Sequence, residues 1–183
     1  GLMMNIALLL ASQQFKGVEE ISKTWEKKVL ERSEKTMKMV FSADGVSREN
    51  SVFYHFFNIT LYKKLVKILH HYSIRSDFGD YADRTIKLAA LFSAAINRDD
   101  STIPPLGDSY EKKYFTGKYV DGSWFYKDGG YVIVKEGGLY LTFKCGFTSC
   151  VHKHVDDGSI TLRYNGQDII VDAGLYNYDS TDP

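Results

Sequence analysis

The sequence has little of what marks membrane proteins and nucleic-acid-binding proteins. Its longest fully apolar run, Ile6 to Ala11, is too short to cross a bilayer. The 23 basic and 23 acidic residues balance and form no basic block, so the chain has no electrostatic footprint for nucleic acid. The beginning of the sequence lacks a charged segment followed by a cleavage site, so no signal peptide is expected there.

Cysteine and proline are also scarce. The only cysteines, Cys145 and Cys150, lie close together in the segment CGFTSC. In an oxidising compartment they can form a disulfide if their Cα atoms come within reach, and two unpaired thiols are an equal alternative. Aromatic residues, in contrast, are plentiful, with 13 Tyr and 11 Phe. Aromatic rings suit sugar binding, although most are expected in the core.

The first part of the chain carries four helical patterns. Apolar residues recur at helical spacing over residues 1–15, 16–41, about 50–72 and 81–97. Ser42-Ala-Asp-Gly45 provides a stop for the second helix, and Asn50 or Ser51 can cap the third. In the third helix one inward face is predicted, made of Tyr54, Phe57, Leu61, Leu65, Ile68 and Tyr72.

The second part reads as strands. Over residues 102–130 the periodicity fades and Gly, Pro and Asp dominate, which predicts a boundary between residues 1–101 and 102–183. Gly137-Gly138 and Asn165-Gly166 then join two predicted hairpins, since such pairs accept the positive φ of tight turns. In the second hairpin Tyr164 should face Gln167, which predicts a core face of Ile160, Leu162, Ile169 and Val171. Helices followed by antiparallel strands give an α+β fold class.

The segment His152-Lys-His154 carries the clearest chemistry. If it is extended, both imidazoles point to one side, and the hairpin register brings Asp172 back beside it. Two imidazoles and a carboxylate suit zinc, provided that another ligand comes from elsewhere. The alternative is a pair of surface histidines on a strand, which the spacing alone favours.

This segment also carries a family resemblance. The pattern H-K-H-x-D-D-x-S-I-x-L, followed by I-I-V-D-A-G-L-Y-N-Y, resembles the signature of heparinase II/III-type polysaccharide lyases. The resemblance implies an incomplete α/α toroid followed by an antiparallel β-sandwich. It implies that His152 is catalytic, and that His154 and Asp172 bind a structural zinc. The third zinc ligand would be a downstream histidine outside this chain.

A second block of residues supports the same resemblance. A D-G-x-x-x-E-x-S-x-x-Y-H pattern is matched by Asp44, Gly45, Glu49, Ser51, Tyr54 and His55. The resemblance implies a catalytic role for Tyr54 and substrate binding by Glu49 and His55. The alternative for Tyr54 is a core aromatic residue on the helix stripe.

Two further segments fit the same family. Residues 103–109 resemble its P-x-x-G-D-S link between the toroid and the sandwich. Pro104 and Pro105 stiffen this link. Asp108 can be either a turn residue or a functional residue. An Asn-His pair often precedes the family's Gly-Leu helix start. The sequence is therefore expected to be an internal piece that begins just after that pair, at Gly1.

The resemblance implies a polysaccharide lyase that cleaves a uronic-acid-containing glycan by β-elimination. The partner would be an acidic polysaccharide, and the location would be periplasmic or at the cell surface. The alternative is a non-catalytic protein of the same fold, either one that binds glycans or one associated with surface-polysaccharide biosynthesis.

Overall fold

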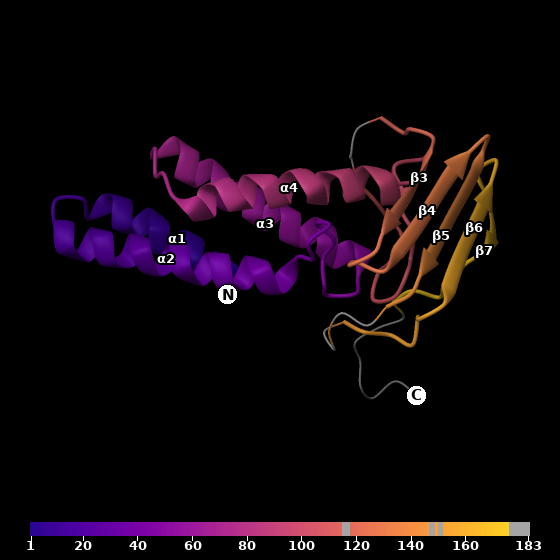
Figure 1. Ribbon diagram of the computed structural model, residues 1–183, viewed down its shortest axis with the longest axis horizontal. Helices are drawn as coiled ribbons and strands as arrows, with labels where there is room; N and C mark the ends of the chain where they lie inside the picture. The colour runs from indigo at the N-terminus through magenta and orange to yellow at the C-terminus, as the bar shows by residue number, and fades with distance from the viewer. Residues whose placement is uncertain (115–117, 147–148, 150–151, 176–183) are drawn as a thin grey trace.

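The computed structural model describes residues 1–114, 118–146, 149 and 152–175. Four helices come first: α1 (Leu2–Gln14), α2 (Glu19–Val40), α3 (Val52–His71) and α4 (Asp77–Ile96). Helix α1 packs on α2, and α3 packs on α4 (Figure 1). The α+β fold class predicted from the sequence is confirmed. None of the helices in the described residues is long and apolar enough to cross a membrane.

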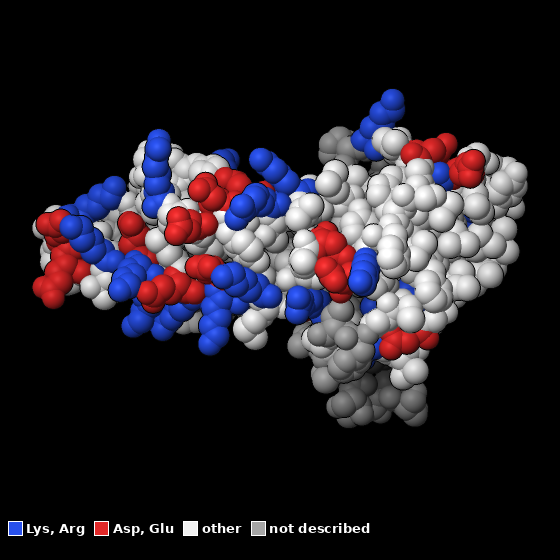
Figure 2. Space-filling view, in the orientation of Figure 1, with Lys and Arg blue, Asp and Glu red and all other residues white. Residues whose placement is uncertain are grey.

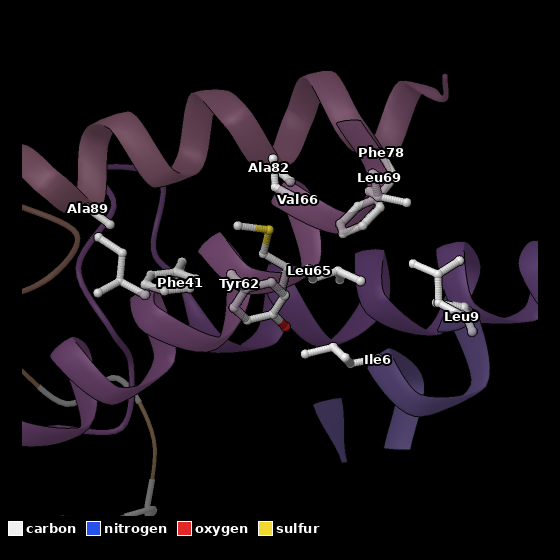
Figure 3. Close-up of a cluster of buried hydrophobic side chains, with 13 residues drawn as sticks. Ile6, Leu9, Phe41, Tyr62, Leu65, Val66, Leu69, Phe78, Ala82 and Ala89 are labelled. Atoms are coloured by element: carbon white, nitrogen blue, oxygen red, sulfur yellow. The ribbon is translucent and has the colours of Figure 1, made fainter. Parts of the chain in front are cut away.

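The helices share a core of apolar side chains (Figure 3). Leu9 of α1, Val29 of α2, Leu65 of α3 and Ala82 of α4 are all fully buried in it. Each helix therefore contributes apolar residues to this core, while the charged residues of α2, α3 and α4 lie mostly on their outer sides. Figure 2 shows this outer surface, on which Lys and Arg alternate with Asp and Glu along the helices.

Two helix predictions need correction. Helix α4 begins at Asp77 and not at Tyr81, because Ser76 caps it by accepting the Gly79 N–H at 3.1 Å. The inward face of α3 is also different, since Phe57 of the predicted stripe is 48% exposed. The face that is buried comprises Val52, His55, Phe56, Asn58, Ile59, Tyr62, Leu65, Val66 and Leu69.

A five-stranded antiparallel sheet follows, with its strands in chain order. It comprises β3 (Gly122–Tyr126), β4 (Tyr131–Glu136), β5 (Leu139–Lys144), β6 (Ser159–Tyr164) and β7 (Gln167–Ile170). The short strands β1 (Thr102–Ile103) and β2 (Lys112–Lys113) pair separately. Strands β1, β2 and β3 lie in the stretch where the sequence showed no periodicity.

Both predicted hairpins are present. Gly137 and Gly138, like Asn165 and Gly166, have positive φ as their turns require. Tyr164 pairs with Gln167 as predicted, but a bulge between Leu162 and Arg163 shifts the register of β7. The predicted core face is wrong: Ile160 is 41% exposed, and Ile169 and Val171 are 60% and 59% exposed. The buried face of β6 carries Thr161 instead.

The sheet packs its other face against the ends of α3 and α4 (Figure 1). Buried Lys135 donates hydrogen bonds to the carbonyls of Ala94 at 3.0 Å and Asn97 at 2.5 Å. The Tyr140 hydroxyl donates to the Ile96 carbonyl at 2.6 Å. The last carbonyls of a helix have no partner within it, so these side chains complete α4 and fix the sheet to the helices.

Candidate functional site

The predicted catalytic residues Tyr54 and His152 lie in direct contact. Their rings are stacked, with centroids 3.7 Å apart and planes inclined by 20°. Tyr54 lies in the first turn of α3, where the Ser51 hydroxyl accepts its backbone N–H at 3.2 Å. It is half-buried and outside both core clusters, which argues against the core reading. The two residues are 98 positions apart in the sequence, and the fold brings their side chains together.

His152 reaches Tyr54 from a loop and not from a strand. The loop connects β5 to β6, and His152 has φ of 52°, in the left-handed region. The prediction that His152-Lys-His154 is extended is therefore wrong. The Lys153 amine bonds to Asp156 at 2.6 Å and to Asp157 at 3.0 Å, which folds the loop back on itself.

The ring of His152 lies between two carboxylates. Its Nδ1 forms a short hydrogen bond with Oδ2 of Asp108, whose side chain is 3% exposed. Its Nε2 lies 3.6 Å from Oε2 of Glu49. Since a carboxylate only accepts, the Asp108 contact places a proton on Nδ1 and fixes the orientation of the imidazole. Glu49, predicted to bind substrate, is therefore a neighbour of the histidine predicted to be catalytic.

The sequence left open whether Asp108 is a turn residue or a functional one, and the structure places it in the site. It reaches the site because the segment before it lies against the start of α3, where Ser51 forms an isolated bridge with Gly107. Gly107 has φ of 61°, and a Cβ there would meet the carbonyl oxygen of Asn50 at 3.0 Å. The signal in the sequence was the Gly-Asp pair after two prolines, a glycine that permits close backbone approach just before a carboxylate.

His55, in contrast, lies inside the protein. It is 1% exposed, its Nδ1 accepts the Ser47 N–H at 3.2 Å, and its Nε2 lies 3.0 Å from both the Ala89 carbonyl and the Ser93 hydroxyl. Burial lowers its pKa to about 4, so the ring is neutral at physiological pH. These contacts favour a structural role, in which His55 joins α3 to α4 directly behind Tyr54.

The candidate site is identified by the side chains of Tyr54 and His152 and not by the size of a surface hollow. A hollow of about 520 Å³ lies elsewhere, near Leu69, His70 and Asp80. It contains no stacked pair of proton-carrying side chains comparable to Tyr54 and His152.

Comparison with known proteins assigns the fold. The heparinase II/III N-terminus family model matches residues 3–128, and the heparinase II/III-like C-terminal model matches residues 120–182. The chain belongs to the heparinase II/III family. The search of curated protein sequences returned no match.

Solved structures of heparinases have the same fold. A heparinase III gene product with methylated lysines superposes with a TM-score of 0.85 at 18% identity, covering 99% of this chain and 33% of that one. The heparan sulfate lyase HepC from Pedobacter heparinus superposes with a TM-score of 0.84 at 20% identity, covering 98% and 33%. The chain thus spans about a third of the length of these heparinases.

The heparinase resemblance also predicted a zinc site at His154 and Asp172. No group of three His, Cys, Asp or Glu side chains in the described ranges is placed to hold a metal ion. The Asp172 carboxylate accepts hydrogen bonds from the Ser159 hydroxyl at 2.7 Å and from the Gly174 N–H at 2.9 Å. Such bonds orient the carboxylates that bind metals. An imidazole and a carboxylate are also ligand types that zinc accepts, and the further ligands would have to come from elsewhere.

The choice between a Cys145–Cys150 disulfide and two unpaired thiols depends on a residue outside the described ranges. Cys145 is exposed, and Cys150 is among the residues that the structure does not describe.

Proposed function

We propose that this chain carries part of the active site of a polysaccharide lyase that cleaves a uronic-acid-containing glycan by β-elimination. The observation that supports this best is the stacked pair of Tyr54 and His152, with His152 held by the buried carboxylate of Asp108. Membership of the heparinase II/III family supports the proposed reaction class. The heparan sulfate lyase among the similar structures has a substrate of the proposed kind.

The reaction requires two proton transfers, one from C5 of the uronate and one to the oxygen bonded to its C4. The C5 proton of the uronate is removed, the bond from C4 to the linking oxygen breaks, and a C4–C5 double bond remains. The leaving oxygen takes up a proton. Tyr54 can act as the base at C5, as the acid at the leaving oxygen, or as both.

His152 is the second proton-handling group in this proposal. Asp108 accepts the hydrogen bond from Nδ1 in either protonation state of the ring, and Glu49, 3.6 Å from Nε2, can pair with the ring when both nitrogens carry protons. Stacking against Tyr54 holds the two rings in a fixed relation. Proton transfer between these side chains and the sugar depends on such positioning.

We further propose that His154 and Asp172 contribute to a structural zinc site completed by residues elsewhere in the protein. The support is the donor types and the hydrogen bonds that orient Asp172. Metal analysis of the whole protein with and without His154→Ala tests this, since equal zinc in both would remove the assignment. The proposed location, periplasmic or at the cell surface, follows from the resemblance.

The experiment for the lyase function follows the new double bond. The whole protein is incubated with heparan sulfate, heparin and alginate in turn, and the ultraviolet absorbance of the unsaturated uronate is recorded. We expect absorbance to rise with at least one glycan. A folded protein that binds an acidic glycan without producing the double bond would instead support the non-catalytic alternative.

A further inference from the structure

A cluster of aromatic side chains continues from Tyr54 along the surface. The Phe53 ring lies edge-on to Tyr54, with centroids 5.3 Å apart, and the Tyr110 ring lies 4.9 Å from Phe53 at a tilt of 34°. The backbone N–H of Phe53 donates to the Ser109 hydroxyl at 3.2 Å, which ties the two segments together. Tyr110 is 40% exposed, so this row of rings ends at solvent.

A single lysine amine lies over these rings. Lys112 Nζ is 5.4 Å from the centroid of Phe53, 5.9 Å from Tyr110 and 5.3 Å from Tyr114. The ring faces attract the cation and hold it at this place. In the ranges that the structure describes, no Asp or Glu forms an ion pair with Lys112. Its charge is therefore left for another anion.

The comparison with Lys153 makes this lysine distinctive. Lys153 belongs to the same loop as His152, but Asp156 and Asp157 neutralise it at 2.6 Å and 3.0 Å. A chain with equal numbers of basic and acidic residues has no general attraction for a polyanion, so an acidic glycan needs individual cations near the site. Lys112 meets that requirement beside the row of rings that begins at Tyr54.

Packing alone accounts for only part of the cluster. Tyr114 stacks on Phe56 with centroids 4.5 Å apart, and Phe56 belongs to the core beneath the sheet. Burial raises the pKa of Tyr114 to about 12, as expected for a structural ring. Tyr110 and Lys112 are exposed instead, and burial does not explain why an aromatic face and an unpaired cation meet there.

We propose that Phe53, Tyr110 and Lys112 form a subsite for an acidic sugar next to the one held at Tyr54 and His152. The apolar C–H face of the sugar packs on the exposed ring of Tyr110, and its carboxylate or sulfate pairs with the Lys112 amine. This inference rests on the proposed lyase function. It adds the direction in which the glycan leaves the reacting residues, across the start of α3 toward β2.

The chain offers a matched control for Lys112. Lys113 follows it directly in β2 and is equally exposed, but successive side chains of a strand point to opposite faces. Lys112→Ala and Lys113→Ala therefore remove the same charge from the same strand. Tyr110→Ala removes the proposed stacking face, and Tyr110→Phe keeps that face while it removes only the hydroxyl.

The test uses the whole protein carrying Tyr54→Phe, so that an acidic oligosaccharide binds without turnover. Titration calorimetry with heparan sulfate and alginate oligosaccharides gives Kd for each added substitution. We expect Lys112→Ala to weaken binding about tenfold, a size typical of one charge-assisted hydrogen bond, and to reduce the salt dependence of Kd. Lys113→Ala and Tyr110→Phe should remain within twofold of the parent, and Tyr110→Ala should weaken binding several-fold.

Turnover by the protein with Tyr54 intact separates the two ideas. We expect Lys112→Ala to raise KM while kcat stays within twofold, because the subsite lies beyond the reacting atoms. Turnover with equal KM for the Lys112→Ala and Lys113→Ala proteins would overturn the subsite and leave the lyase function standing. A parent protein that neither binds nor cleaves any of these glycans would overturn both.

Discussion

The candidate site has a helical side, at the start of α3 with Tyr54, and a loop side, between β5 and β6 with His152, and the two are built in different ways. On the helical side, several of the hydrogen bonds join residues close in sequence: Ser51 to Tyr54, Ser47 to His55, and Asn58 to both Ser47 and Glu49. On the loop side, His152 is held by Asp108, 44 positions away. Local contacts form as the helices fold, whereas distant ones require the sheet to be in place. The position of Tyr54 should therefore depend less on the sheet than the position of His152 does.

The largest effect is expected on the helical side, from Tyr54→Phe. This change keeps the ring that stacks on His152 and removes only the hydroxyl, so folding should be unchanged. Loss of a proton-transfer group lowers turnover by roughly 10²–10⁴-fold. The measurement is kcat of the whole protein on the glycan that gives the strongest absorbance change.

Tyr164→Phe is the matched control for that experiment. Tyr164 is half exposed at the far end of β6, so loss of its hydroxyl should leave kcat unchanged. Near-normal turnover by a folded Tyr54→Phe protein would show that Tyr54 only packs.

The second-largest effect concerns protein stability and depends on His55, which is buried on the helical side. With a pKa of about 4 in the folded protein against 6.5 when unfolded, His55 takes up a proton more readily in the unfolded chain. Its contribution to stability is complete above pH 6.5 and is lost as the pH falls toward 4, by about 3 kcal/mol in all. Urea unfolding across this pH range measures it.

His55→Gln should flatten the fall in stability between pH 6.5 and 4. His71→Gln, a change at an exposed position near the end of α3, should leave the fall as it is in the parent protein. Parallel pH profiles for the parent and the His55→Gln protein would mean that burial of His55 does not set the acid sensitivity.

The two sides also differ in what the sequence predicts. Ser51 as the cap of α3 and the first-turn position of Tyr54 follow from local patterns, and both are confirmed. The buried face of α3 does not follow, because its amphipathic signal is divided among aromatic residues on several sides. The role of Asp108 is also beyond a local pattern, since only the contact between Gly107 and the start of α3 brings that carboxylate to His152.

The exposed face of the sheet shows the same limit. An alternating apolar pattern predicts that one face is covered, and it does not identify the covering element. Of the two faces, the one that packs on the helices carries Lys135, Thr142 and Lys144, all nearly fully buried. Lysine and threonine are usually found at the surface. Each has a polar partner: Lys135 donates to the Asn97 carbonyl at the end of α4, the Thr142 and Thr161 hydroxyls bond to each other, and Lys144 donates to the Gly146 carbonyl.

A third prediction concerns the loop side. Asp108→Asn keeps the size of the side chain and removes the negative charge of the group that accepts the hydrogen bond from His152 Nδ1. Turnover should fall roughly 10–100-fold, as is common for residues that orient a functional histidine. Nitrogen NMR of the imidazole should also show a change in the tautomer of His152, which a purely structural role would not produce.

Asp83→Asn is the control for Asp108. Asp83 contacts His70 at 3.1 Å in another His–Asp pair, which is exposed and lies away from Tyr54. That change should leave both turnover and the His152 signals unaltered. An Asp108→Asn protein with turnover within twofold of the parent would contradict the positioning role.

The smallest effect tests whether the loop side depends on the sheet. Tyr140 is buried, and its hydroxyl donates to the Ile96 carbonyl at the end of α4. Tyr140→Phe leaves that carbonyl without this donor, which should lower the free energy of unfolding by about 1–2 kcal/mol. Lys135 still bonds to the Ala94 and Asn97 carbonyls, so the sheet should stay in place and turnover should fall at most a few-fold. If Tyr140→Phe abolished turnover while the protein stayed folded, the position of His152 would depend on this one contact. If it changed neither stability nor turnover, the Lys135 hydrogen bonds and the apolar contacts would be enough to hold the sheet to the helices.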